Sequence, residues 1–269
     1  MAEFLGKFAF LNFKAASRFN SKSSLREAGF TFIILLTRYS IMKQETAKNI
    51  LKENEKTWDE IAQTFEKTRH YHWDLEPLIG KAKKNSKILD LGCGNGRLFE
   101  ILKEKGVSYI GIDNSKQLIN LAKKKYPKAQ FFVGSALNLP FKDNSFDSIY
   151  SMAVLHLIPS KQSRLLFLKE AKRVLKKNGR ITLTVWYLWS KKYFKFILTS
   201  SLLKLLGKSK LGWKDAYIPW QKKYKRYHHA FTKKELVSLF KKAGFKIEKC
   251  EYLKRNKRKV NLFINARKP

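Results

Sequence analysis

The chain has 269 residues, enough to bury one hydrophobic core with some residues left for an added segment. Apolar residues make up 44%, which excludes a largely disordered chain. The 57 Lys and Arg residues against 21 Asp and Glu give a net charge of +36, which indicates a polyanionic partner such as RNA or an anionic membrane, or else a Lys-rich proteome.

Cysteine content and hydropathy limit the setting of the protein. Cys93 and Cys250 are the two cysteines, too few for a disulfide framework or a cysteine-rich zinc site. We therefore expect the reducing cytoplasm and no bound metal. No apolar run reaches the roughly 18 to 20 residues that a membrane span needs.

Composition changes near residue 42. Residues 1–41 are rich in Phe, Ser, Lys and Arg and contain two acids, Glu3 and Glu27. This profile is typical of a transit peptide or of a basic arm that binds nucleic acid. It also fits an upstream extension of the reading frame, with Met42 as the natural start. In each case we expect a weakly ordered N-terminal extension.

Predicted elements follow in chain order from Met42. A charged helix over Lys43–Glu55 leads into the segment Trp58–Ala62, and strands then alternate with amphipathic helices. The predicted strands are Lys87–Leu91, Ser108–Ile112, Gln130–Val133, Phe146–Ser151 and Arg180–Trp186, and the predicted helices are Arg97–Lys105, Lys116–Lys125, Lys161–Leu175 and Thr232–Ala243. This alternation predicts an α/β fold with a mostly parallel sheet and helices on both faces.

Two β-type runs close the chain. Phe245–Leu253 and Val260–Ala266 are separated by the basic segment Lys254–Lys259. This arrangement predicts a C-terminal antiparallel hairpin at one edge of the sheet.

The strongest motif is Ile88–Gly96, at the end of the first predicted strand, where ligands of parallel sheets bind. Its alternate glycines allow a sharp turn and a close approach of a ligand. A dinucleotide fingerprint would have glycine at Arg97, and Asp90 would repel a pyrophosphate but suits a ligand with an ammonium and a sulfonium. Asp113 ends the second strand and can accept both hydroxyls of a ribose. The alternative is a tight strand–helix turn with a solvated Asp.

These residues resemble the class I S-adenosylmethionine-dependent methyltransferases. The similar segments are Leu89–Gly96, Gly111–Asp113, and Asn138–Phe141 with Phe146 and Asp147. The resemblance implies a Rossmann-like sheet and S-adenosyl-L-methionine as cofactor. It implies that Gly92 and Gly94 pack on the methionine part, that Asp90 orients its amino group, and that Asp113 holds the ribose. The full cofactor-binding set that it implies is Arg69, Asp90, Gly92, Cys93, Gly94, Asp113, Asn114, Ser135, Ala136 and Met152.

Ser135 is a departure from that family. The family commonly has Asp at this position, where it binds the adenine amino group. Ser135 still offers a hydroxyl acceptor, so we expect a weaker adenine contact at the same place.

A narrower resemblance covers most of residues 57–269. The chain is similar to the tRNA wobble-uridine (carboxymethyluridine) methyltransferases in five segments: Thr57–Ala62 with Phe65, Thr68, Arg69 and Trp73; Ser151–His156; Val185–Trp186; Ile218–Trp220; and Arg226–Phe231. It departs from them at Leu157, where the family tends to have a second histidine, and in a basic insert around residues 191–216. The resemblance implies one methyltransferase domain over residues 42–269.

The resemblance also implies the reaction. A carboxymethyl group with a pKa of about 4 is ionised at neutral pH and is already nucleophilic, so no catalytic triad is needed and none is evident. Cations or donors must hold the carboxylate, and the candidates are Arg226, Tyr227, His229 and His156. A structural role is an equal alternative for His156, and we expect His228 to be structural. The implied partners are the anticodon loop of tRNA and a small zinc-binding activator protein.

Residues 187–231 form a basic and aromatic cap insert. Lysines alternate with Trp and Tyr there, which is typical of proteins that bind single-stranded RNA loops. The same residues can instead pack on the sheet. Phe194–Leu206 also has the pattern of a basic amphipathic helix that lies on a membrane. Two alternatives therefore remain: a methyltransferase for a small or lipid-like acceptor, of the quinone-precursor type, at a membrane surface, and a non-enzymatic RNA-binding protein.

Overall fold

The computed structural model describes residues 42–68, 76–79, 82–221 and 223–269. The expected N-terminal extension 1–41 lies outside the described residues, as do Arg69 and Trp73. The described residues from Lys43 onward belong to one compact unit.

The core of the fold is a seven-stranded sheet with the order β3-β2-β1-β4-β5-β9-β8. Its strands are β1 Lys87–Leu91, β2 Ser108–Asp113, β3 Gln130–Val133, β4 Phe146–Met152, β5 Leu175–Trp186, β8 Lys246–Arg255 and β9 Arg258–Arg267. Strands β1 to β5 pair in parallel, whereas β9 runs antiparallel to both β5 and β8. The predicted α/β class, the mostly parallel sheet and the C-terminal hairpin at its edge are confirmed.

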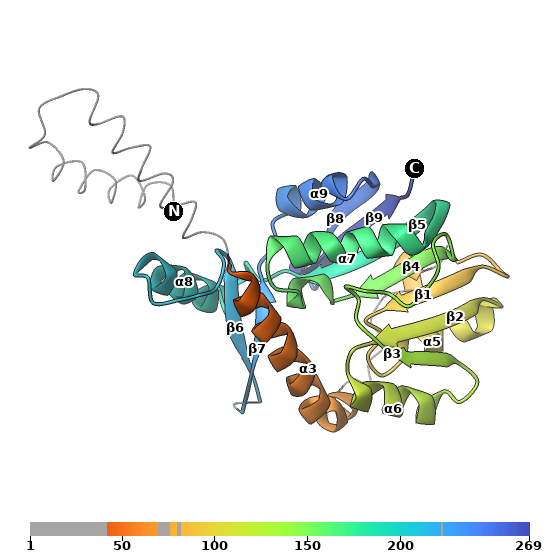
Figure 1. The fold of residues 1–269 in the computed structure, drawn as a ribbon, viewed down its shortest axis with the longest axis horizontal. Helices are drawn as coiled ribbons and strands as arrows, with labels where there is room; N and C mark the ends of the chain where they lie inside the picture. The colour runs from red at the N-terminus through yellow and green to blue at the C-terminus, as the bar shows by residue number, and fades with distance from the viewer. Residues whose placement is uncertain (1–41, 69–75, 80–81, 222) are drawn as a thin grey trace, which may run out of the picture. The chain divides into compact units, whose positions relative to one another are not determined.

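Helices cover the two faces of the sheet (Figure 1). On one face, α7 (Lys161–Val174) and α9 (Lys233–Lys242) bury side chains in the larger core cluster, including Phe167, Leu239 and Phe240. On the other, α4 (Glu76–Ile79), α5 (Arg97–Leu102) and α6 (Lys116–Lys125) pack against β1 and β2. Apolar alternation in the strands supplies both cores, because successive side chains point to opposite faces.

The C-terminal hairpin has a shorter turn than the sequence predicts. Strands β8 and β9 continue to the two residues Asn256 and Lys257, whose φ angles are 47° and 62°. Two central residues with positive φ fit the twist of paired strands, so both strands extend through the basic segment.

The cap insert contains a feature that the sequence analysis does not predict. Strands β6 (Asp215–Trp220) and β7 (Tyr224–His229) form a separate antiparallel hairpin, preceded by α8 (Lys191–Leu205). Helix α8 and strand β6 share a small apolar cluster that includes Ile197 and Ile218, together with Leu188 and Ala230 from the adjoining loops.

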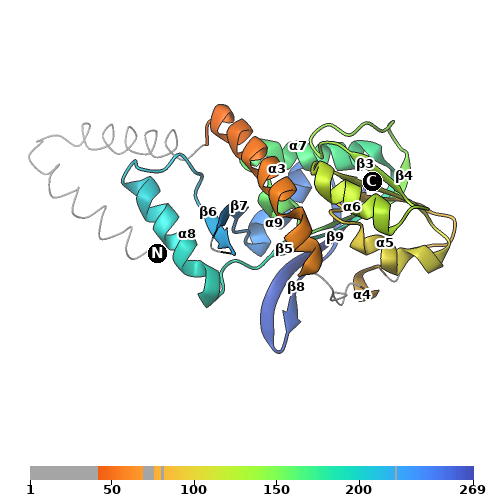
Figure 2. The ribbon, with the colours of Figure 1, turned by 90° about the horizontal axis from the view of Figure 1, so that it is seen from below.

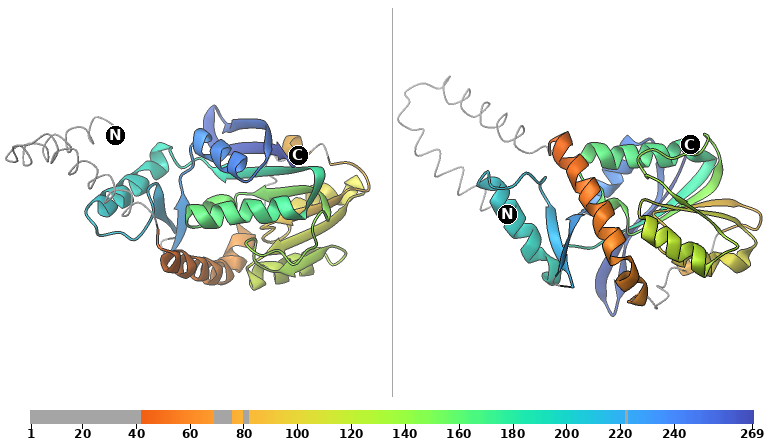
Figure 3. Two further views of the ribbon diagram at one scale, coloured as in Figure 1. Left: turned by 45° about the horizontal axis from the view of Figure 1, so that its top comes forward. Right: turned by 60° about the horizontal axis from the view of Figure 1, so that its bottom comes forward.

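A long helix at the start of the described residues covers the carboxyl ends of the strands. The predicted charged helix and the segment Trp58–Ala62 form one continuous helix, α3 (Gln44–Lys67). Figure 3 shows α3 between the β6–β7 hairpin and α6. Among the described residues, no helix is long and apolar enough to cross a membrane.

Candidate active site

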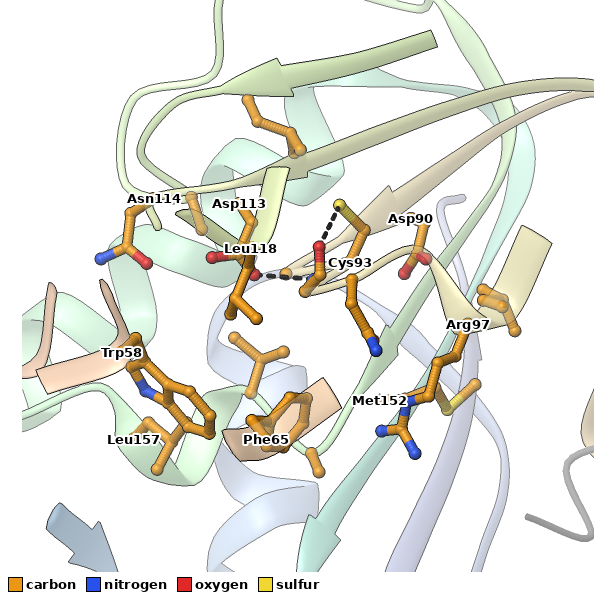
Figure 4. A pocket seen from close by; sticks show the side chains of 18 of the residues that line it. Trp58, Phe65, Asp90, Cys93, Arg97, Asp113, Asn114, Leu118, Met152 and Leu157 are labelled. Atoms are coloured by element: carbon orange, nitrogen blue, oxygen red, sulfur yellow. Dashed lines mark hydrogen bonds between the residues drawn. The ribbon is translucent and has the colours of Figure 1, made fainter. Parts of the chain in front are cut away.

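A cavity of about 410 Å³ lies at the carboxyl ends of β1, β2 and β4. The loops after β1, β3 and β4 form its floor and sides, and residues of α3 and β7 cover it (Figure 4). Parallel strands that end together leave such a crevice, so the position follows from the topology.

The glycine loop after β1 forms the floor of the cavity. Gly92, Gly94 and Gly96 have φ angles of 79°, 56° and 78°, which favour glycine. A Cβ atom at Gly92 would lie 2.3 Å from Cγ2 of Val154, whereas a Cβ atom at Gly94 would meet nothing within 4 Å. Gly92 therefore allows close packing within the protein, and Gly94 leaves backbone facing open space.

Asp90 lies buried at the end of β1, with 2% of its surface exposed. The hydroxyl group of Tyr109 donates a hydrogen bond to Asp90 Oδ2 over 2.7 Å. Burial outweighs this bond and raises the pKa of Asp90 to about 7. A cation in the cavity would stabilise the ionised form of this carboxyl group.

Asp113 links the end of β2 to the glycine loop. Its Oδ2 accepts a hydrogen bond from Gly94 N and its Oδ1 accepts one from Ser115 N, both over 2.9 Å. Burial raises the pKa of Asp113, while these amide donors act in the opposite direction. The carboxylate is thus held at the edge of the cavity, with Asn114 beside it (Figure 4).

Polar contacts hold helix α3 against the glycine loop and the start of α6. Asp59 accepts hydrogen bonds from Ser115 Oγ over 2.6 Å and from Gln117 N over 3.0 Å, and Asn95 donates to Glu66. Its aromatic residues Trp58 and Phe65 meet edge to face, with centroids 5.2 Å apart, and both line the cavity. The helix therefore excludes water from the side opposite Asp90 and Asp113 (Figure 4).

The structure brings the expected cofactor residues together. Nine of the ten line the cavity, namely Asp90, Gly92, Cys93, Gly94, Asp113, Asn114, Ser135, Ala136 and Met152. The tenth, Arg69, is outside the described residues. Ser135 Oγ accepts a hydrogen bond from Leu137 N over 3.1 Å within its own loop, which takes one of the two lone pairs of this hydroxyl group.

A further part of the cavity lining is aromatic and basic. Arg226 of β7 is 3% exposed, and its guanidinium lies 5.2 Å, 5.5 Å and 5.8 Å from the ring centroids of Trp58, Trp186 and Trp220. Arg226 lines the same cavity as Asp90 and Asp113. One cavity is therefore lined both by the carboxylates of Asp90 and Asp113 and by the guanidinium of Arg226.

Two histidines adjoin this arginine. The rings of His156, His228 and Trp186 lie 5.3 to 5.4 Å from one another, and all three residues line the cavity. His228 Nδ1 is 2.8 Å from the carbonyl oxygen of Arg226, so this nitrogen carries the proton. Burial lowers the pKa of His228 to about 3 and the pKa of His156 well below its usual value. Both imidazoles are neutral at pH 7.

Strand β7 separates the expected donors into two groups. Side chains alternate along a strand, so Arg226 and His228 face the cavity while Tyr227 and His229 face away from it. Tyr227 is fully buried, with Arg164 Nη1 3.4 Å from its hydroxyl group. His229 lies between Asp215, 2.6 Å from Nδ1, and Glu235, 2.8 Å from Nε2. This placement corrects the expected set, because neither Tyr227 nor His229 reaches the cavity and His228 does.

His228 lines the cavity although a structural role was expected for it, because its orientation depends on the β6–β7 hairpin, which was not predicted from the sequence. Asn95 and Arg97 also line the cavity and were not among the expected site residues. The alternation of Arg226 and His228 along an extended segment was the available signal. It required a strand assignment for Tyr224–His229.

Comparison with known proteins identifies the family of the chain. Residues 89–183 match the family described as methyltransferase domain. A protein of Encephalitozoon cuniculi (strain GB-M1) named as a methyltransferase is 32% identical over 194 residues, which cover 71% of this chain and 85% of that protein. The chain belongs to the class I S-adenosylmethionine-dependent methyltransferases. This methyltransferase uses S-adenosylmethionine as cofactor.

Other relatives of this methyltransferase carry more specific names. A Schizosaccharomyces pombe protein named tRNA (carboxymethyluridine(34)-5-O)-methyltransferase is 29% identical, covering 71% of this chain and 89% of that protein. A Xenopus tropicalis protein with the same activity in its name is 35% identical over 134 residues. The match covers 49% of this chain but only about a fifth (21%) of that longer protein.

Solved structures show the same fold. A methyltransferase from Methanosarcina mazei described as SAM-dependent has a TM-score of 0.64 and 29% identity, covering 73% of this chain and 99% of that one. A Haloferax volcanii complex between the Trm112 methyltransferase activator and a methyltransferase contains a chain with a TM-score of 0.56 and 17% identity, covering 79% and 97%. The second likeness concerns the fold alone.

The residues of the cavity fit S-adenosylmethionine. Asp90 would face its ammonium group, Asp113 would hold the ribose hydroxyls, and the backbone at Gly94 leaves the open space that a close ligand needs. Ala136 and Leu137 would flank the adenine.

Proposed function

We propose that this methyltransferase esterifies the carboxylate of 5-carboxymethyluridine at the wobble position of tRNA. The observation that carries the proposal is the position of Arg226, which is buried and lines the same cavity as the cofactor carboxylates. A buried guanidinium suits a carboxylate, because its planar fork can donate two parallel hydrogen bonds.

The residues around Arg226 match the needs of this reaction. The bound cofactor supplies an electrophilic methyl group, and an ionised carboxylate needs no base to activate it. Neutral His156 and His228 add no competing charge beside Arg226. The indoles of Trp58 and Trp186 offer apolar surfaces for an unstacked base and exclude water from the reacting atoms. These residues thus position the acceptor, which is the main requirement of a methyl transfer.

The names of the relatives support the same acceptor. Proteins from Schizosaccharomyces pombe and Saccharomyces cerevisiae that resemble the chain are named tRNA (carboxymethyluridine(34)-5-O)-methyltransferases. The segment Arg226–Phe231 itself resembles this family in sequence.

Nucleoside analysis tests the proposal. The protein is incubated with cofactor labelled in its methyl group and with tRNA that carries 5-carboxymethyluridine, and the tRNA is digested to nucleosides. We expect label in 5-methoxycarbonylmethyluridine. Label that appears only in other nucleosides, or only in an organic extract of added lipids, contradicts the proposal.

Replacement of Arg226 gives a sharper prediction. We expect Arg226→Ala to lower the single-turnover rate of tRNA methylation by about 100-fold, because a charge-assisted contact to the carboxylate is lost. Cofactor affinity, measured by calorimetry, should stay within about twofold, since Arg226 belongs to β7 and not to the strand ends and loops that carry the expected cofactor residues. Equal losses of cofactor binding and methylation would place Arg226 in the cofactor site instead.

One observation favours the second candidate, a lipid-like acceptor at a membrane surface. Along α8 and just beyond it, Phe194, Leu198, Leu202 and Leu206 form an exposed apolar stripe, with Leu206 exposed by 64%. Lysines flank the stripe, as in helices that lie on anionic membranes. The organic extract in the labelling experiment detects this alternative directly.

We also propose that a small zinc-binding activator pairs along β3, one of the two edge strands of the sheet. Phe132 and Val133 on this strand are 43% and 51% exposed, which is unusual for large apolar residues at a sheet edge. The Haloferax volcanii complex contains an activator bound to a methyltransferase of the same fold.

Light scattering after size-exclusion chromatography tests this partner. We expect the chain to form a one-to-one complex with an activator protein of the Trm112 kind, and Phe132→Lys to abolish it. Leu166→Lys is the matched control, since Leu166 is 44% exposed on α7 and lies away from β3. Complex formation that survives in the Phe132 variant, or fails equally in both, rules out this interface.

A further inference from the structure

A second concavity, of about 2240 Å³, lies on the sheet outside the active site. Helices α7 and α9 pack on one face of β5, β9 and β8, and the opposite face of these strands forms the floor of the groove. The floor is polar, with Thr182, Asn261 and Asn265 among its residues. The β8–β9 hairpin and the start of α8 border it. Figure 2 shows the ribbon of this hairpin, which projects from the sheet, and α8 across from it.

The groove is strongly basic. Eleven of its lining residues are Lys or Arg, whereas three are acidic. Each acid already has a basic partner: Asp147 is 2.8 Å from Lys176, Glu248 is 2.9 Å from Arg180, and Glu251 is 2.8 Å from Lys249. The acids therefore do not offset the other cations of the groove.

Six of these eight other cations gather on two sides. Lys191 and Lys192 belong to the first turn of α8, and Lys254, Arg255, Arg258 and Lys259 belong to the hairpin. The chain has no Asp or Glu between Glu170 and Asp215, so the α8 side carries no acid to offset its charge.

The groove and the active-site cavity share a lining residue. Trp186, at the end of β5, lines both the groove and the cavity, where it lies 5.5 Å from Arg226. A polymer that lies in the groove can thus place one of its units beside Trp186 and Arg226.

We propose that this groove binds the phosphate backbone of an RNA stem–loop and directs one unstacked base to Trp186 and Arg226. This inference rests on the proposed tRNA substrate and names the surface that holds it. Concave basic grooves with aromatic residues bind single-stranded nucleic acid, whereas a flat bilayer cannot reach a polar floor between two walls. The groove therefore fits a flexible polyanion better than a membrane.

Two charge-matched variants test the groove. The groove variant combines Lys254→Gln, Arg255→Gln and Arg258→Gln, and the control combines Lys123→Gln, Lys124→Gln and Lys128→Gln, three exposed lysines on or near α6. Both lose the same charge and leave Asn256 and Lys257 of the turn unchanged. Binding of an anticodon stem–loop RNA is measured for each variant at several salt concentrations.

We expect the groove variant to bind this RNA about 30-fold more weakly and to reduce the slope of log affinity against log salt by about 2, because roughly 0.7 to 0.9 counterions are released per phosphate contact. The control should bind within about threefold of the unaltered protein, and cofactor affinity should not change in either variant.

Three results would overturn the inference. Equal losses in both variants would show that the whole +36 field binds RNA rather than the groove. Unchanged RNA binding in the groove variant would exclude the groove as the RNA-binding surface. The same conclusion would follow if the groove variant lost affinity only for vesicles of anionic lipid, measured in parallel. Failure of the proposed tRNA reaction is seen separately, as an unaltered protein that binds the stem–loop but transfers no label to it.

Discussion

At the scale of single residues, Asp90 shows how burial adjusts a cofactor ligand. The carboxyl group lies between the glycine loop and Tyr109, and burial raises its pKa to about 7 despite the hydrogen bond that Tyr109 donates. Asp113 and Arg97 also act on it, the first raising and the second lowering the pKa. Its charge state therefore changes within the ordinary range of assay pH.

Cofactor affinity should depend on pH for this reason. The ionised form of Asp90 attracts the ammonium of S-adenosylmethionine, and this form is lost as the pH falls through about 7. We expect affinity to be nearly constant above that value and to fall by up to tenfold per pH unit below it, with uptake of the cofactor releasing a proton. Calorimetry from pH 5.5 to 7.5 in buffers of different ionisation enthalpy measures both.

The variant Asp90→Asn provides the control. It should bind the cofactor more weakly and with a shallower pH profile, and any dependence that remains belongs to Asp113, whose pKa is also raised by burial. An unaltered protein with a flat profile over this range would contradict the assignment of Asp90.

At the scale of elements, strand β7 has two separate functions on its two faces. Arg226 and His228 line the cavity, whereas Tyr227 and His229 lie in the interior on the other side. His229 connects Asp215 of β6 with Glu235 of α9, so it ties the hairpin to the domain. Burial raises the pKa of Glu235, but the hydrogen bond and charge of His229 and those of Lys214 outweigh it and lower the pKa to about 2.

Replacement of His229 should therefore affect stability rather than substrate binding. His229→Ala leaves the buried carboxylate of Asp215, 2% exposed, without its histidine, and we expect the free energy of unfolding to fall by about 3 kcal/mol. Chemical denaturation measures the loss, with the exposed Lys234→Ala on α9 as control. The folded variant should keep its cofactor affinity, and a variant of full stability with impaired tRNA methylation would return His229 to the acceptor site.

At the scale of the whole molecule, the positive charge is organised and not merely large. The basic groove beside β8 and β9 leads to Trp186, and Trp186 leads to Arg226 in the cavity. The cofactor carboxylates Asp90 and Asp113 line the same cavity. We expect the polyanion and the cationic cofactor each to meet residues of opposite charge.

Local sequence determined the cofactor end of this protein. Local residues specify the geometry of this end, namely Ile88–Gly96 and Asp113. Alternate glycines and an acid at the end of a strand specify a tight strand–helix turn with a ligand beside it. Hydrophobic periodicity likewise determined the parallel strands and the terminal hairpin, since both are local patterns.

The acceptor end was decided by tertiary structure. Whether Arg226 or Tyr227 faces the cavity depends on the register of β7 against β6, and a shift of one residue would exchange the two faces. The raised pKa of Asp90, the closure of α3 and the basic groove likewise arise from residues far apart in the chain. Burial and the meeting of distant charges exist only after folding, so no local pattern could reveal them.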